Sequence, residues 1–322
     1  MKKAFALAVG FCVLLCAGFA PAADKPVTVG ISQIVEHPAL DAARKGFIDE
    51  LAATGYVEGK NIEFDYKNAQ NNRPVSGQIA RKFVGDKVDL ILAISTPSAQ
   101  DAAAAAKEIP ILFAAVTDPV SAGLVKSLDA PGGNVSGTMD KSPVAAQLDL
   151  ILEILPNVKR LGTVYNPGET NSAVSVNELQ QEADTRGIEL IKASATSSSA
   201  VRPAGESLVG KVDAIHVPTD NTVVLALESV VKVAQDNKIP LFAADVDSVA
   251  RGAIAALAVD YYKLGRQTGA MAAKVLEKKA RISELPVEYQ KELQLHINPG
   301  QAEKMGVTLP DSVLKRAAKV IR

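Results

Sequence analysis

The sequence has no tryptophan and only two cysteines, and both cysteines lie within the first 23 residues. Cys12 and Cys16 follow Phe11 and Leu15, whereas a lipid-attachment signal needs a small residue just before its cysteine, so no lipid anchor is expected. The rest of the chain therefore has no disulfide, no thiol nucleophile and no cysteine metal ligand. Sugar sites usually stack the ligand on aromatic rings, and this chain has few of them, which disfavours a sugar ligand.

Motifs for catalysis are also missing. The three histidines, His37, His216 and His296, do not have metal-ligand spacing. No G-x-S-x-G, P-loop or G-x-G-x-x-G sequence follows a predicted strand. We therefore expect no enzymatic activity, no metal and no cofactor. The chain also lacks a strongly basic run, which argues against a nucleic-acid partner.

Residues 1–23 read as a secretory signal peptide rather than as part of the fold. Lys2 and Lys3 precede an apolar stretch over 4–19, and residues 20–23 offer small side chains for cleavage. Removing these two lysines from the 35 basic residues leaves 33 against 36 acidic ones, a net charge of about −3. The sequence thus predicts an exported protein of the periplasm, about 300 residues long, with one large domain or two of ordinary size.

One unit occurs twice in the remaining chain. Residues 87–118 begin with Lys-Val-Asp and continue with an apolar run, a polar turn and a helix-like stretch, before Ile-Pro opens a second apolar run. Residues 211–245 repeat this order. A repeated strand–turn–helix–strand unit predicts two similar α/β lobes with a cleft between them, which is where a ligand would bind.

Strand-like and helix-like segments alternate along the whole chain, which predicts parallel sheets with helices on both faces. We expect the chain to cross first between the lobes after the strand at 135–139, and we expect a single last strand at 287–297. The expected first lobe comprises 24–139 with about 253–284, and the second comprises 140–252 with about 285–322.

Small polar residues follow many of the predicted strands. In parallel α/β sheets, ligands bind at these carboxyl ends, where helix N-termini direct N–H groups outward. Hydroxyl donors at 95–98 suit a carboxylate, whereas Asp118, Asp220 and Asp245 suit an ammonium group, so together they describe a site for a zwitterion. Each such residue on its own is equally typical of an ordinary helix cap. The candidate ligand-binding residues are Ser32, Gln33, Ser95, Thr96, Ser98, Thr117, Asp118, Asn166, Asn171, Ser172, Asp220, Asn221 and Asp245.

Six short segments, at 36–41, 55–61, 95–100, 117–120, 165–167 and 218–221, together resemble one family. It is the ABC-transporter substrate-binding family that includes tryptophan- and tyrosine-binding lipoproteins, and the likeness extends over the chain after the signal peptide. The resemblance implies a type I periplasmic-binding-protein fold, with two Rossmann-like lobes and three crossing segments at the hinge. It also implies capture of an amino acid, often aromatic, for delivery to an ABC permease in the inner membrane.

The resemblance also implies individual roles. Ser95, Thr96 and Ser98 would hold the carboxylate with help from Thr117. Asp220 is the first choice for the α-amine and Asp245 the second, while Asn171 and Ser172 would close over the ligand. We expect a monomer. Two alternative functions stay open: the protein could be a ligand-sensing subunit for a receptor kinase, or an exported α/β enzyme.

Overall fold

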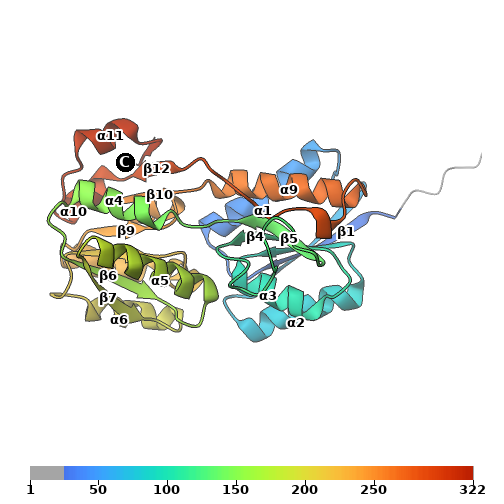
Figure 1. The fold of residues 1–322 in the computed structure, drawn as a ribbon, viewed down its shortest axis with the longest axis horizontal. Helices are drawn as coiled ribbons and strands as arrows, with labels where there is room; N and C mark the ends of the chain where they lie inside the picture. The colour runs from blue at the N-terminus through green and yellow to red at the C-terminus, as the bar shows by residue number, and fades with distance from the viewer. Residues whose placement is uncertain (1–24, 322) are drawn as a thin grey trace, which may run out of the picture.

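The computed structural model describes residues 25–321 and shows two α/β lobes side by side (Figure 1). The expected signal peptide lies outside the described residues. A six-stranded sheet in the order β11-β5-β4-β3-β1-β2 forms the first lobe, and a seven-stranded sheet in the order β13-β12-β10-β9-β8-β6-β7 forms the second. All strand pairs are parallel except β10 with β12, which agrees with the predicted parallel sheets.

In the first lobe, α1 and α9 cover one side of the sheet, and α2 and α3 cover the other (Figure 1). Its elements are β1 (Val27–Gln33), α1 (Pro38–Ala53), β2 (Ile62–Asn68), α2 (Arg73–Asp86), β3 (Leu90–Ile94), α3 (Thr96–Ala105), β4 (Ile111–Val116), β5 (Val135–Met139), α9 (Tyr261–Leu276) and β11 (Glu288–Tyr289). The strands β3 and β4 are buried along their whole length, as strands covered by helices on both faces must be.

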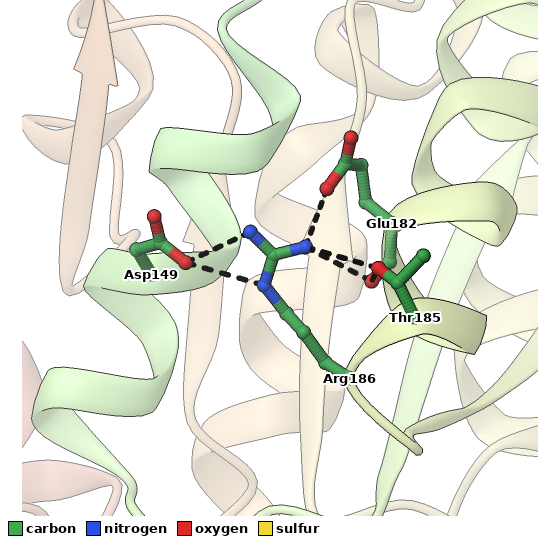
Figure 2. Close-up of polar contacts among 4 residues, drawn as sticks. All are labelled: Asp149, Glu182, Thr185 and Arg186. Carbon is green, nitrogen blue, oxygen red and sulfur yellow. Dashed lines mark hydrogen bonds and ion pairs between the residues drawn. The ribbon is translucent and has the colours of Figure 1, made fainter.

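The second lobe contains the remaining elements. They are α4 (Val144–Ile154), β6 (Arg160–Tyr165), α5 (Thr170–Thr185), β7 (Glu189–Ser194), α6 (Val201–Ser207), β8 (Ala214–Val217), α7 (Asn221–Leu225), α8 (Leu227–Asp236), β9 (Leu241–Ala243), β10 (Ala255–Ala258), β12 (Gln294–Ile297), α10 (Pro299–Lys304), α11 (Asp311–Arg316) and β13 (Lys319–Val320), with short 3₁₀ turns at Ser198–Ala200 and Asp247–Val249 here and at Ile282–Glu284 in the first lobe. Figure 2 shows how α4 and α5 are tied together at the surface, where Arg186 Nη2 donates to Asp149 Oδ1 over 2.9 Å and Nη1 bonds Glu182.

Each lobe has its own hydrophobic core. Buried side chains from 29–139 and 259–287 form one cluster, and those from 144–258 and 295–313 form the other. The chain therefore crosses between the lobes three times, after β5, after β10 and after β11. The first crossing agrees with the prediction.

The expected domain boundaries at the other two crossings were wrong. The strand β10 was assigned to the first lobe, but it pairs with β9 and β12 in the second sheet. The single strand expected over 287–297 is two strands, because β11 pairs with β5 in the first sheet and β12 belongs to the second. The chain beyond Pro299 lies on the second lobe, where β13 pairs with β12 and Arg316 bonds Glu153 on α4.

Close approach of α1 and α9 explains several glycines of the first lobe. A Cβ atom added at Gly265 would lie 1.9 Å from the carbonyl oxygen of Ala43, and one at Gly46 would lie 2.1 Å from that of Tyr262. The two helices thus pack backbone to backbone. This fixes the N-terminus of α9, which directly follows the second crossing, against α1.

Candidate functional site

A cavity lies between the lobes at the carboxyl ends of both sets of strands, where the repeated units predicted it. Its empty space is about 340 Å³, including the part that opens to solvent. The first lobe contributes His37, Ala39, Leu40, Ser95, Ala115, Thr117 and Tyr261; the second contributes Asn171, Thr219, Asp220, Asn221, Val224 and Asp245; and Asp140 belongs to the first crossing.

The polar turns of the two repeats meet here. Ser95 follows β3, and Asn221 follows β8. The Ser95 hydroxyl donates a hydrogen bond of 3.1 Å to Asn221 Oδ1. Two further hydrogen bonds join the lobes, from Asn71 Nδ2 to Thr222 Oγ1 at 3.0 Å and from Gln100 Nε2 to Thr170 Oγ1 at 3.3 Å. The two lobes are therefore in direct polar contact through these three hydrogen bonds.

Two residues of the cavity wall have unusual backbone conformations. Ser95 has φ of 78° and Ala115 has φ of 58°, a region that side chains other than glycine rarely adopt. Ala115 is also the point at which the register of β4 against β5 shifts. Such strain persists where the surrounding structure imposes it, and it concentrates at functional sites.

Three buried carboxyl groups line the cavity, Asp140, Asp220 and Asp245, and a fourth, Glu169, bonds the lining residues Asn171 and Asn221; each of the four is no more than 6% exposed. Among residues 25–321, no lysine or arginine forms an ion pair with any of them. A buried negative charge without a cation is costly, so the site is electrostatically suited to a positive group.

The four carboxyl groups differ in how fully their oxygens are used. Glu169 accepts five hydrogen bonds, from Asn171, Asn221 and Thr222. Asp220 accepts three, from Asn166 N, Ser172 Oγ and Val223 N, and thereby caps α7. Because a carboxylate offers about four acceptor positions, these two have little capacity left.

From side chains and N–H groups of other described residues, Asp140 and Asp245 accept two hydrogen bonds each. Thr117 Oγ1 and Tyr261 Oη donate to Asp140 over 3.0 and 2.6 Å, and Ser248 donates its N–H and hydroxyl to Asp245. Burial raises the pKa of both carboxyl groups, and the charge of Asp245 raises the pKa of Asp140 further. The pKa of Asp220 rises to about 7, chiefly through burial and then through the nearby Glu169.

Six of the sequence-predicted residues line the cavity: Ser95, Thr117, Asn171, Asp220, Asn221 and Asp245. The other seven are Ser32, Gln33, Thr96, Ser98, Asp118, Asn166 and Ser172, and they are not among its lining residues. Gln33 holds the start of α1 through Arg44 and Asp41, and Asp118 closes its own turn onto Val120 and Ser121. Ser32, Thr96 and Ser98 each have a buried hydroxyl without a partner.

Sequence reasoning missed Asp140, Glu169 and Tyr261. Asp140 directly follows a predicted strand, so its position did carry the signal used for the other acids. The N-cap of α5 is Glu169, and Asn171 and Ser172 lie in the first turn of the helix. Both side chains turn toward the Thr219–Asp220 segment.

In the described part of the chain, no helix is long and apolar enough to cross a membrane.

Comparison with known proteins places this architecture in a family. Residues 28–321 match the family model described as ABC transporter substrate binding protein. The chain is 49% identical over 274 residues to a protein from Clostridioides difficile (strain R20291) named tyrosine-binding protein, covering 85% of this chain and 79% of the relative.

Three solved structures resemble the chain over almost all its length. A conserved domain protein from Vibrio cholerae is 48% identical with a TM-score of 0.91, covering 92% of this chain and 100% of the other. An ABC domain from Streptococcus pneumonia in complex with L-Trp is 36% identical with a TM-score of 0.89, covering 92% and 100%. The ligand-free, open structure of a substrate-binding protein with adhesive properties from Clostridium difficile is 44% identical with a TM-score of 0.69, covering 91% and 99%.

The family is one of binding proteins, in agreement with the prediction of a receptor rather than an enzyme. More distant structures with the same two-lobed architecture, at 18% identity or less, show the periplasmic-binding fold alone. The chain belongs to the ABC transporter substrate-binding protein family.

Proposed function

We propose that this protein captures an aromatic amino acid in the cavity between its lobes and delivers it to an ABC permease from outside the cytoplasm. The observation that carries the ligand class is the set of buried carboxyl groups without a cation, next to hydroxyl and amide donors. A zwitterion matches both kinds of group at once. The names of the relatives, one tyrosine-binding and one in complex with L-Trp, support an aromatic side chain.

The ligand ammonium is placed between Asp140 and Asp245 rather than at Asp220. Asp140 and Asp245 each retain free acceptor positions. When both carboxyl groups are ionised they repel each other, as the raised pKa of Asp140 indicates, and a cation between them relieves this repulsion. Asp220 already accepts three hydrogen bonds from its own lobe. Its role is to hold α7 and the turn that carries Asn221.

The ligand carboxylate is placed at the N-terminus of α3, beside Ser95. The first-turn N–H groups of a ten-residue helix and the positive end of its dipole favour an anion there. Ser95 also contacts Asn221 of the opposite lobe, so a carboxylate at this point contributes to the contact between the lobes.

Hinge closure follows from the same geometry, because the proposed ligand contacts come from both lobes and from the first crossing. The TM-scores support it: the L-Trp complex superposes better than the ligand-free open structure, although the latter is closer in sequence. The present arrangement of lobes corresponds to the closed form in this proposal. Ligand binding shifts the equilibrium toward that form, which the permease recognises.

A thermal-shift and calorimetric screen of the purified protein against the common amino acids and a panel of sugars tests this proposal. A ligand that binds only the folded state raises the melting temperature. We expect L-tyrosine or L-tryptophan to do so. Stabilisation by a sugar, with no response to any amino acid, would contradict the proposal.

A further inference from the structure

The imidazole of His37 lines the cavity at the junction between β1 and α1. His37 occupies the N-cap position of α1 in an extended conformation, but its side chain makes no capping hydrogen bond. Its Nδ1 atom is buried and has no hydrogen-bond partner within residues 25–321. Because nearly all buried polar atoms in folded proteins have a partner, an unpaired nitrogen at a binding cavity indicates a group that a ligand would complete.

The surroundings of His37 differ from those of the acidic pair. Ala39 and Leu40, in the first turn of α1, and Val224, on α7, line the same cavity with apolar side chains. The charged group that acts on His37 is the guanidinium of Arg251, which also donates to the carbonyl of Val224 over 2.7 Å. Arg251 also acts on Asp245, whereas the charge of Asp245 acts on Asp140, and both acids act on Tyr261. The cavity thus combines an acidic region with an apolar one, where the imidazole lies beside the side chain of Asn221.

His37 is neutral at physiological pH. Burial, and secondarily the charge of Arg251, lower its pKa to about 3. A neutral imidazole offers one N–H and one lone pair, so it pairs with the O–H of a phenol or the N–H of an indole without burying another charge. An apolar wall with one such group is suited to an aromatic ring that has a polar atom at its edge.

We propose that His37 determines specificity by hydrogen-bonding the polar edge of the ligand's aromatic ring, so that the protein prefers tyrosine and tryptophan to phenylalanine. The inference rests on the proposed function and names the ligand's side chain more closely. Phenylalanine would fill the same space but leave the buried Nδ1 atom unpaired. A site built to hydrogen-bond a ligand group rejects the analogue that lacks it strongly, whereas apolar contacts alone discriminate weakly.

The test is calorimetric titration of L-tyrosine, L-tryptophan and L-phenylalanine into the wild type and into His37→Leu, which keeps an apolar side chain of similar reach. In the wild type we expect tyrosine and tryptophan to bind at least about tenfold more tightly than phenylalanine. In His37→Leu we expect the affinity for tyrosine to fall at least about tenfold, while that for phenylalanine changes by less than about twofold. Phenylalanine thus serves as the control for folding within the same variant.

Two outcomes overturn the inference and leave amino-acid binding intact. They are equal wild-type affinities for phenylalanine and tyrosine, and an equal loss for all three ligands in His37→Leu. Binding of none of the three to the wild type would instead overturn the proposed function, and the inference with it. If His37→Leu does not fold, the wild-type ranking still decides, and His37→Gln, which restores a polar atom, is expected to retain the preference for tyrosine.

Discussion

Tyr261 Oη donates a hydrogen bond of 2.6 Å to Oδ2 of Asp140, and the two residues mark two different crossings between the lobes. Asp140 is the first residue after β5, and Tyr261 is the first residue of α9. Both side chains line the cavity. A cation held by Asp140 therefore acts directly on the segments about which the lobes move, which couples ligand capture to closure in the proposed mechanism.

Replacing the acidic pair tests the ammonium site. Asp140→Asn and Asp245→Asn each keep the shape of the side chain but remove its charge, and we expect either to weaken amino-acid binding at least about 30-fold, because loss of one partner of a buried charge pair costs roughly 2–5 kcal/mol. Calorimetric titration measures the change. Asp149→Asn is the matched control, since Asp149 lies on the surface of α4 and bonds Arg186 (Figure 2).

The control variant should bind as the wild type does. If both Asn variants at the cavity retain wild-type affinity while Asp220→Asn loses it, the ammonium group lies at Asp220 and the assignment made here is wrong.

The pH dependence of stability should reveal the raised pKa of Asp220. The pKa of its carboxyl group is 3.8 in the unfolded chain and about 7 in the folded protein. Between these values the folded state retains a proton that the unfolded state has lost, so this group's contribution to the free energy of unfolding falls as pH rises from about 4 to 7, by at most roughly 1.4 kcal/mol per pH unit. Above pH 7 the contribution is constant.

Other buried groups titrate in the same range, so the measurement is a difference. Burial lowers the pKa of His37 to about 3 and that of His216 to about 4. The contribution of these two histidines to the free energy of unfolding therefore falls as pH decreases below about 6.5, which is opposite to the trend for Asp220. Urea denaturation at each pH gives the free energy of unfolding of the wild type and of Asp220→Asn. The difference between the two values removes the contributions of the histidines, which both proteins share. We expect the wild type to become less stable relative to the variant between pH 4 and 7. A difference that is constant over this range would refute the prediction.

Close packing of α1 against α9 predicts that Gly265→Ala destabilises the first lobe. The added methyl group would meet the backbone of Ala43, which cannot rotate away, and overpacking of this kind costs about 1–3 kcal/mol or more. Gly85→Ala in α2 is the control, because a Cβ atom there meets nothing within 4 Å, and alanine is the better helix former. Thermal denaturation should show a lower melting temperature for Gly265→Ala and an equal or higher one for Gly85→Ala.

Much of the fold could be read from the sequence because central strands of both lobes, among them β3, β4 and β8, are fully buried and largely apolar runs. The strand β5 begins and ends where the sequence predicts. The second and third crossings could not be read, because β10 is a short apolar strand that suits either lobe, and β11 is only two residues long. Their sheets are decided by pairing partners that lie far away in the sequence.

The candidate site was predictable in position but not in detail. The repeat predicted a cleft between two lobes, and the turns after β3 and β8 meet at that cleft through the contact of Ser95 with Asn221. What the sequence does not encode locally is how many hydrogen bonds each acid already accepts. Asp220 precedes a short helix and is occupied as its cap, whereas Asp140 has spare capacity, and only the folded structure distinguishes the two.

The central claim is that the ammonium group of the ligand binds between the buried carboxyl groups of Asp140 and Asp245. The most direct measurement is a calorimetric comparison of L-tyrosine with 3-(4-hydroxyphenyl)propionate, which keeps the ring and the carboxylate but lacks the amine. The account predicts that the propionate binds at least about 100-fold more weakly, because a carboxylate pair without its cation stays uncompensated. Equal affinity for the two ligands would contradict the account.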